Sequence, residues 1–198
     1  MINLVDFYKK TTNITHFEGF SQQCKEESTF LRNIVNDESI NNVMEIGFNA
    51  GHSAELFLSS NKNINLVSFD IGYHNYVQLG KQFIDKTYPD RHKLIIGNSL
   101  DTVPEYFKKE NTKFDLIFID GGHDYHIAIN DILNCKNLAH NKTIVILDDT
   151  MNNHKCINTW NIGPNRAWKE SKESNVIKEI GNHDFSPTHG LSWGYYIF

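Results

Sequence analysis

Short apolar runs alternate with longer amphipathic segments along most of the chain. The apolar runs are rich in Val, Ile, Leu and Phe, which is typical of strands buried on both faces of a parallel sheet. The longer segments space their apolar residues as helices do, so they predict helices on both faces of that sheet. Strands are predicted at Asn42–Gly47, Asn65–Phe69, His92–Gly97, Phe114–Asp120 and Lys142–Leu147, and helices at His52–Ser60, Tyr73–Tyr88, Thr102–Lys108 and Asp124–Leu138.

The regular alternation ends after Asp149. Thr150–Gly163 has no periodic pattern, and Pro164–Lys172 predicts a helix with a proline near its first turn. Two further runs, Val176–Ile180 and Leu191–Phe198, are typical of a closing hairpin. The chain therefore has an α/β pattern that ends in two additional strands.

The segment before the first predicted strand also has a helical pattern, in Ser21–Val35. A chain of 198 residues with 39% hydrophobic residues can bury one sizeable core and is too short for two comfortable domains. We therefore expect a single domain over residues 1–198. Its core is expected at 42–198, with a helical segment at 1–41 that packs over one edge of the site.

The charge and the cysteine content indicate which partners and which cellular location to expect. The formal net charge is -5 and there is no basic run that could follow a phosphate backbone, so no nucleic acid is expected. The stretch "MINLVDFYKKTTNITHF" lacks the long apolar segment of a signal peptide, and no stretch nears the roughly 18 to 20 apolar residues of a membrane span, so no membrane is expected. Cys24, Cys135 and Cys156 lack the spacing of a disulfide framework or a zinc site, which favours a cytoplasmic protein. The oligomeric state is left open, with a homodimer among the alternatives.

A glycine-containing turn follows the first predicted strand, in "VMEIGFNAGHSAELF", Val43–Phe57. Gly47 and Gly51 allow the backbone to approach a ligand, and the helix that follows directs free N–H groups toward an anion. The spacing Glu-x-Gly-x-x-x-Gly differs from the Gly-x-Gly-x-x-Gly of dinucleotide sites, so hydride transfer is disfavoured. An ordinary strand-to-helix turn is the alternative interpretation.

Two later strand ends carry residues suited to a nucleoside. Asp70 ends the strand in "LVSFDIG", about 20 residues beyond the glycines, where an acidic residue can bind both hydroxyls of a ribose. The stretch "LIIGNSLDTV" places Asn98, Ser99 and Asp101 where an adenine edge could bind. A solvated aspartate at a strand end is the alternative for Asp70.

Acidic residues also end the fourth and fifth predicted strands. "IFIDGGH" places Asp120 at one strand tip, and "TIVILDDT" places Asp148 and Asp149 at the next. Neighbouring parallel strands bring their carboxyl ends to one edge of the sheet, so the three carboxylates should converge. A cluster of this kind needs a neutralising cation, and oxygen ligands suit Mg²⁺ or Ca²⁺ better than Zn²⁺. Helix capping is the alternative for one or two of them.

"EIGFNAGHSA" followed by Asp70, "GNS" and "FIDG" resembles the class I S-adenosylmethionine-dependent methyltransferases over most of Asn42–Phe198. This resemblance implies a Rossmann-like, seven-stranded, mostly parallel sheet with helices on both faces and an antiparallel last strand. Within that superfamily the chain is most similar to the metal-dependent small-molecule O-methyltransferases of the catechol and macrolide-sugar types. The implied cofactors are S-adenosyl-L-methionine and a divalent metal, Mg²⁺ by preference, and the implied partner is a small hydroxylated substrate.

The resemblance also implies roles for individual residues. The methionine end of the cofactor would be held by Glu45, Gly47, Gly51 and Ser53, the ribose by Asp70 and the adenine by Ser99. Asp120, Asp148 and Asp149 would bind the metal, and Asp120 would also lie at the cofactor and take part in catalysis. The catechol type has Asn at the position of Asp149, whereas the macrolide-sugar type is acidic there. This difference favours a sugar or another aliphatic hydroxyl as the acceptor.

His123 lies three residues after Asp120, where catechol-type enzymes have a Lys base and some macrolide-sugar enzymes have a His. Methyl transfer from a sulfonium requires an aligned hydroxyl and removal of its proton, which a neutral imidazole can accept near pH 7. His123 is therefore the candidate base, with a loop histidine bonded to a backbone carbonyl as the alternative. The long loop before "GPNRAW" predicts a lid, with Arg166 or Trp160 touching substrate and Trp168 in the core.

Two other functions remain open at this point. One is an iron oxygenase that uses His123 or His126 with carboxylates, although this chain lacks the all-β pattern expected for it. The other is a non-catalytic binding or scaffold protein with the S-adenosylmethionine fold. An oxygenase would need Fe²⁺ and oxygen, and a scaffold would bind cofactor without transferring its methyl group.

Overall fold

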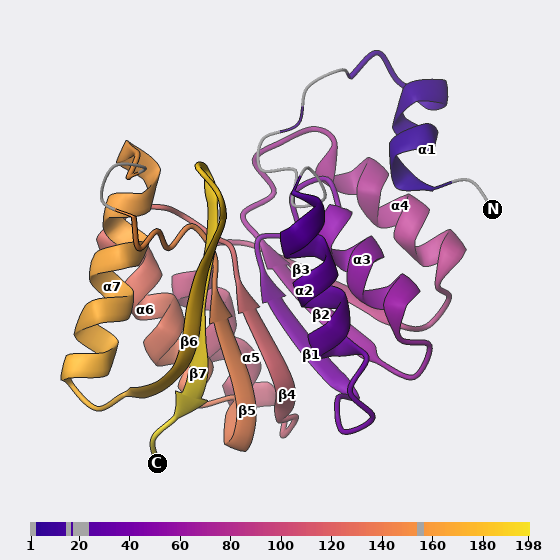
Figure 1. The fold of residues 1–198 in the computed structure, drawn as a ribbon. Coiled ribbons are helices and arrows are strands. Elements are labelled where there is room, and N and C mark those ends of the chain that lie inside the picture. Colours follow the sequence, from indigo (N-terminus) through magenta and orange to yellow (C-terminus); the bar gives the residue numbers. More distant parts are fainter. Residues whose placement is uncertain (1–2, 15–16, 18–23, 154–156) are drawn as a thin grey trace.

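The computed structural model describes residues 3–14, 17, 24–153 and 157–198. Seven strands form one sheet in the order β3-β2-β1-β4-β5-β7-β6 (Figure 1). Strands β1 to β5 pair in parallel, β7 is antiparallel to β5, and β6 is antiparallel to β7. The predicted fold is thereby confirmed. The strands are β1 (Asn42–Ile46), β2 (Asn65–Asp70), β3 (His92–Ile96), β4 (Phe114–Ile119), β5 (Ala139–Leu147), β6 (Ile177–Ser186) and β7 (His189–Tyr196).

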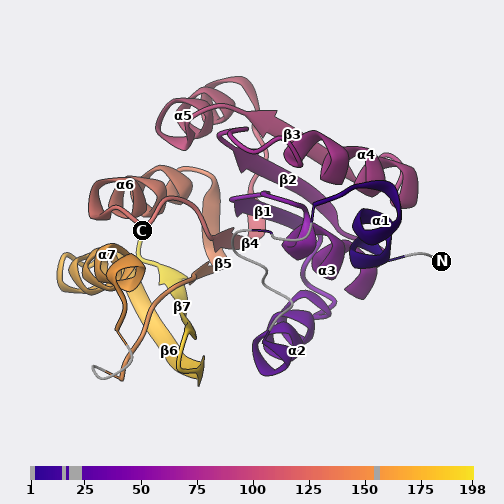
Figure 2. The same ribbon diagram turned by 90° about the horizontal axis from the view of Figure 1, so that it is seen from above.

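Helices cover both faces of the sheet (Figure 2). One face carries the helices α1 (Leu4–Thr11), α2 (Lys25–Val35), α3 (His52–Ser60) and α4 (Val77–Thr87). The other carries α5 (Ser99–Lys109), α6 (Tyr125–Lys136) and α7 (Ile162–Glu173), the last preceded by the short 3-10 helix η1 (Thr159–Asn161). This arrangement leaves the carboxyl ends of the parallel strands as the edge at which loops can build a site.

A hydrophobic core lies on each face of the sheet, and successive residues of a strand pack alternately into one core and the other. In β1, Val43 belongs to the core under α1 to α4, whereas Met44 belongs to the core under α5 to α7. In β4, Leu116 and Ile117 divide in the same way. Because both faces are buried, the strands are apolar at nearly every position, which is the pattern that predicted them.

The amino-terminal segment contains one helix that the sequence pattern did not predict. Helix α1 has only eight residues, and the side chain of its cap Asn3 accepts a hydrogen bond from the backbone N–H of Asp6. The hydroxyl of its buried Tyr8 lies 3.1 Å from the carbonyl oxygen of Ala50 and 3.0 Å from that of Tyr76, and it can donate to either. Tertiary contacts of this kind stabilise a helix too short to be stable by itself. Helix α2 confirms the predicted helix from Lys25 onward, and residues 21–23 lie outside the described residues.

Element boundaries differ from the prediction in two places that matter for the site. Helix α4 begins at Val77 and not at Tyr73, so Tyr73 and His74 belong to the loop after β2. Strand β5 begins at Ala139, earlier than predicted. Cys24 and Cys135 are buried free thiols, while Cys156 lies outside the described residues.

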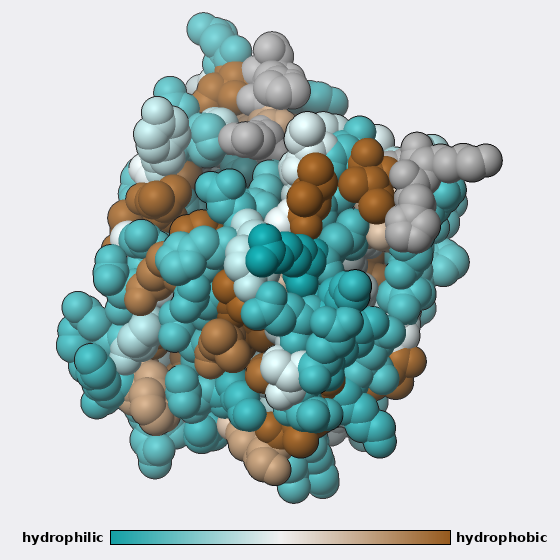
Figure 3. All heavy atoms as spheres, turned by 90° about the vertical axis from the view of Figure 1, so that its left-hand side faces the viewer, coloured by the Kyte–Doolittle hydropathy of each residue, from teal (hydrophilic) through white to brown (hydrophobic). Residues whose placement is uncertain are grey.

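The face formed by α6 and α7 is mostly hydrophilic, with hydrophobic residues in separate groups (Figure 3). That is the surface expected of amphipathic helices whose apolar side packs on a sheet. Among the helices of the described chain, none combines the length and apolar character needed to cross a membrane. The cytoplasmic location stays a prediction.

Candidate functional site

A cavity of about 950 Å³ lies at the carboxyl edge of the sheet, beside the ends of β1, β2, β4 and β5. The chain leaves β1 toward β2 on one side and enters β4 on the other, so the strand order reverses between β1 and β4. Open α/β sheets bind their ligands at such a reversal. The volume is at the upper end of the roughly 300–1,000 Å³ range of small-molecule sites.

Negative charge dominates the lining of this cavity. No Lys or Arg is found among its described lining residues, whereas three histidines are present, His74, His123 and His189. Such a lining attracts a cation and disfavours an anionic ligand. Five carboxylate side chains line it: Glu27, Asp70, Asp120, Asp148 and Asp149.

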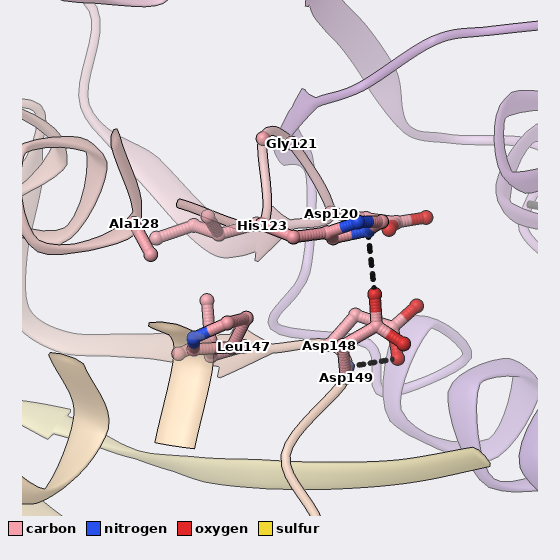
Figure 4. A pocket seen from close by; sticks show the side chains of 10 residues that line it. Asp120, Gly121, His123, Ala128, Leu147, Asp148 and Asp149 are labelled. Carbon is pink, nitrogen blue, oxygen red and sulfur yellow. Dashed lines mark hydrogen bonds and ion pairs between the residues drawn. The ribbon is translucent and has the colours of Figure 1, made fainter. Parts of the chain in front are cut away.

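The predicted convergence of the strand-end carboxylates is confirmed. Ile119 and Leu147 are paired neighbours in β4 and β5, so the residues that follow them leave the sheet side by side. Figure 4 shows the carboxyl groups of Asp120, Asp148 and Asp149 projecting to the same side. Burial, followed by the negative charge of Asp149, raises the pKa of Asp120 well above its usual range. Burial and the charge of Asp120 raise the pKa of Asp148 in the same way.

Hydrogen bonds to its backbone groups fix the position of Asp149, and its carboxylate faces the candidate base. Its φ of +58° lies in the left-handed region, and its backbone N–H donates to Oδ1 of Asp148 over 2.7 Å. The side-chain amide of Asn161 donates to its carbonyl oxygen over 2.8 Å. In this position Oδ2 of Asp149 lies 2.8 Å from Nε2 of His123 (Figure 4). The predicted base and a predicted metal ligand are therefore paired with each other.

Glu27, from α2, is a member of the site that the sequence prediction missed. It is 0% exposed, and neither carboxylate oxygen has a hydrogen-bond partner in the described structure. Burial, then the charges of Asp148 and Asp149, raises its pKa to about 9. A signal was present in the sequence, because Glu27 shares the buried helix face of Leu31 and Val35 at a spacing of four residues.

These carboxylates do not form a completed metal centre. Within the described part of the chain, no three His, Cys, Asp or Glu side chains are grouped so that they could hold a metal ion as they stand. The chemistry of the donors nevertheless suits a hard divalent cation, since all are oxygens and two of them, on Glu27, are buried without partners. Metal binding by Asp120, Asp148 and Asp149 stays a prediction.

The first glycine of the turn after β1 is required for packing as well as for the approach of a ligand. Gly47 has a φ of +96°, and a Cβ on it would lie 1.8 Å from the backbone oxygen of Asp120. Only glycine therefore allows the loop after β1 to lie against the end of β4. Gly51 caps α3 with a φ of +89°, and a Cβ there would meet the ring of Phe48 at 2.9 Å.

Asp70 and Ser99 lie at the cavity as the sequence predicted. Both oxygens of Asp70 accept backbone N–H groups over 2.7 Å, Oδ2 from Asn49 and Oδ1 from Gly72. Asp70 thus joins the loops after β1 and β2. Ser99 is the first residue of α5 and lies close to the buried Asp131, whose pKa burial raises to about 6.

Three predicted cofactor residues lie behind the cavity wall. Glu45, Gly51 and Ser53 are absent from the described lining of the cavity. Glu45 is completely buried, which raises its pKa to about 7, and Oε1 accepts a hydrogen bond from the hydroxyl of Ser68 over 2.6 Å. Ser53 is also buried and bonds to Glu45. Their predicted contact with the methionine end stays a prediction.

The segment between β5 and α7 contributes one aromatic residue to the cavity. Trp160 lines it, whereas Arg166 stacks on the ring of Tyr125 at 3.9 Å from the ring centroid. Trp168 is buried as predicted, and its indole N–H donates to Glu179. His126 lies on the exposed side of α6, outside the described lining, so the histidine pair considered for an oxygenase is not brought together.

The model of the methyltransferase-domain family matches residues 44–150. A search of curated proteins finds no match. Among solved structures, an O-methyltransferase from Bacillus cereus in complex with SAH has a TM-score of 0.75 at 16% identity, covering 97% of this chain and 88% of its own. A candidate caffeoyl-CoA O-methyltransferase from Staphylococcus aureus has a TM-score of 0.73 at 14% identity, with 98% and 90% covered. A TDP-rhamnose 3′-O-methyltransferase of calicheamicin biosynthesis has a TM-score of 0.63 at 17% identity, with 85% and 80% covered. At these identities the likeness shows the fold.

Proposed function

We propose that this chain, which belongs to the methyltransferase-domain family, transfers a methyl group from S-adenosylmethionine to a hydroxyl of a small molecule. The observation that carries this proposal is the cavity at the strand-order reversal, lined by five carboxylates and, among its described residues, by no Lys or Arg. S-Adenosylmethionine supplies the methyl group on a positively charged sulfonium. A cavity with this lining favours that charge, and it disfavours anionic donors such as nucleotides with several phosphates.

Several residues would hold the donor. Asp70 retains lone pairs for ribose hydroxyls beyond its two backbone hydrogen bonds, and Ser99 lies at the same cavity for the adenine. With glycine at position 47, the loop after β1 lies close against the end of β4. Its backbone, and not a side chain, would then face the methionine end of the cofactor. Glu45, Gly51 and Ser53 support this loop from behind, and we propose that they position it for the cofactor.

His123 is proposed as the base. It lies at the mouth of the cavity with its side chain 44% exposed, where an acceptor hydroxyl can reach it. The imidazole would take the hydroxyl proton, and the carboxylate of Asp149 beside Nε2 would stabilise the imidazolium that forms. Asp120 would lie at the reacting atoms, as the prediction from sequence has it.

A divalent cation is part of the proposal, with Mg²⁺ as the preferred ion. Asp120, Asp148 and Asp149 would hold it, and it would lower the pKa of a bound acceptor hydroxyl. The acid cluster supports this, since carboxylates with raised pKa values in one cavity repel each other until a cation or protons neutralise them. The acceptor is proposed to be a sugar or a sugar-bearing compound, because Trp160 and His189 supply an aromatic surface and a polar group at the cavity.

The test is calorimetric titration of S-adenosylmethionine into the purified protein, with Mg²⁺ and then with EDTA. Binding should be followed by transfer of a labelled methyl group to a member of a panel of nucleotide sugars, glycosides and phenols. No binding under either condition would reject the methyltransferase proposal. Binding without transfer to any acceptor would support the non-catalytic binding protein instead.

A further inference from the structure

Among the described residues that line the cavity, Glu27 is the one acidic residue from outside the sheet edge, since Asp70, Asp120, Asp148 and Asp149 all end strands or follow them. It lies in the first turn of α2, on the face of the sheet that α1, α3 and α4 also cover (Figure 2). Helix α2 is held there by the buried Leu31 and Val35 in the core under α1 to α4. The carboxylate is therefore delivered to the cavity by a packed helix and not by a free loop.

Both oxygens of Glu27 are buried and without hydrogen-bond partners in the described structure. Leaving a buried carboxylate unpaired is costly, and natural proteins satisfy such groups with a partner, a water or an ion. The nearby charges are of the same sign, since Glu27 interacts with Asp148 and Asp149 and is felt in turn by Asp120. Among the described residues that line the cavity there is no Lys or Arg to pair with it.

We propose that Glu27 is a direct oxygen ligand of the divalent cation, in addition to the strand-end carboxylates, so that the ion would join helix α2 to the carboxyl edge of the sheet. This inference rests on the metal part of the proposed function. A cation bound there would neutralise the buried carboxylate of Glu27 together with the strand-end carboxylates, since the described lining of the cavity offers no Lys or Arg for this. It also gives the amino-terminal segment a chemical role at the site.

The experiment measures binding of Mn²⁺ alone to the intact chain, by the loss of the electron paramagnetic resonance signal of the free ion. Glu27→Gln should lower Mn²⁺ affinity about tenfold or more. Glu26→Gln, one position earlier on the exposed side of α2, should leave it unchanged. Asp148→Asn should lower it as well. The far-UV circular dichroism spectrum of Glu27→Gln in EDTA should match that of the wild type, which verifies the fold.

Glu27→Asp separates ligation from charge, because it keeps the carboxylate and withdraws it by one methylene. Weaker Mn²⁺ binding in both Glu27 variants supports the proposal. Wild-type binding in Glu27→Gln, with a loss in Asp148→Asn, would overturn it and leave the proposed function intact. Weak binding in Glu27→Gln with wild-type binding in Glu27→Asp would overturn direct ligation. A wild type that binds S-adenosylmethionine but no Mn²⁺ would reject the cation site altogether, and methyl transfer would stand.

Discussion

Nε2 of His123 lies 2.8 Å from Oδ2 of Asp149, across the gap between the loops that follow β4 and β5. The left-handed backbone of Asp149 turns its carboxylate toward the histidine. A carboxylate in this position orients an imidazole and stabilises its protonated form. The pair also restricts how Asp149 could bind a cation, because its Oδ2 already pairs with the histidine.

Replacement of His123 tests its role as base. His123→Ala should lower kcat by about 100-fold or more, since general-base catalysis typically contributes 10²- to 10⁴-fold. The affinity for S-adenosylmethionine, measured by calorimetry, should change little. His126→Ala is the matched control, because that histidine is exposed on α6. Equal turnover in wild type and His123→Ala would remove the proposed role.

Gly47 should be the less replaceable of two glycines that share a positive φ. Ala at Gly47 or Gly72 incurs the same left-handed strain, of about 1–2 kcal/mol. At Gly72 the new Cβ meets Cγ2 of the exposed Ile96 side chain at 2.8 Å, whereas at Gly47 it meets the backbone oxygen of Asp120 at 1.8 Å. Gly47→Ala should therefore lose more unfolding free energy than Gly72→Ala in denaturant titrations. Equal losses would show that the loop can move away from β4.

Asp70 should affect both stability and cofactor binding. Its two oxygens accept the backbone N–H groups of Asn49 and Gly72, and loss of both acceptors should cost on the order of 1–3 kcal/mol. Asp70→Ala should also weaken S-adenosylmethionine binding about tenfold or more, because the ribose loses its carboxylate. Chemical denaturation and calorimetry measure the two effects separately. Weak cofactor binding with unchanged stability would show that Asp70 serves the ligand alone and does not stabilise the fold.

The raised pKa of Glu27 predicts a pH-dependent stability difference in metal-free protein. Its pKa is about 9 in the folded chain against an ordinary value of 4.5, so its contribution to stability is fully present below pH 4.5 and declines as the pH rises toward 9. Glu27→Gln does not titrate. Its advantage in unfolding free energy over wild type should therefore grow with pH, from near zero at about pH 4 to on the order of 3 kcal/mol at about pH 7.

This comparison uses denaturant titrations in EDTA, from acid to neutral pH, with Glu26→Gln as the control. The control removes one carboxylate from the exposed side of α2, so it measures what the loss of a surface charge alone does to the unfolding free energy. A constant difference for Glu27→Gln would mean that Glu27 ionises normally in the folded protein.

Removal of metal should remove activity. EDTA should abolish methyl transfer, and excess Mg²⁺ should restore it. The double variant Asp148→Ala, Asp149→Ala should be inactive with or without EDTA, whereas Asp124→Asn, in the exposed residue just before α6, should behave as wild type. Full activity of the wild type in EDTA, or of the double variant, would contradict the cation site.

The sequence by itself determined the sheet and the edge at which the site lies. Strands buried on both faces are apolar at successive positions, and this local pattern identified β1 to β5, while the two runs of a closing hairpin identified β6 and β7; β6 continues to Ser186, beyond the predicted run. A residue that follows such a strand must leave the sheet at its carboxyl end, so the convergence of Asp120, Asp148 and Asp149 followed from their positions in the chain. These features depend on short-range periodicity and on the rules of parallel pairing.

Tertiary structure alone decided which side chains face each other. Glu27 is separated from Asp148 by most of the chain, and only the packing of α2 turns its carboxylate into the cavity. The pairing of His123 with Asp149 depends on one left-handed residue, and the need for Gly47 comes from the backbone of β4. Contacts between distant segments are set by how the elements pack, which no local pattern contains.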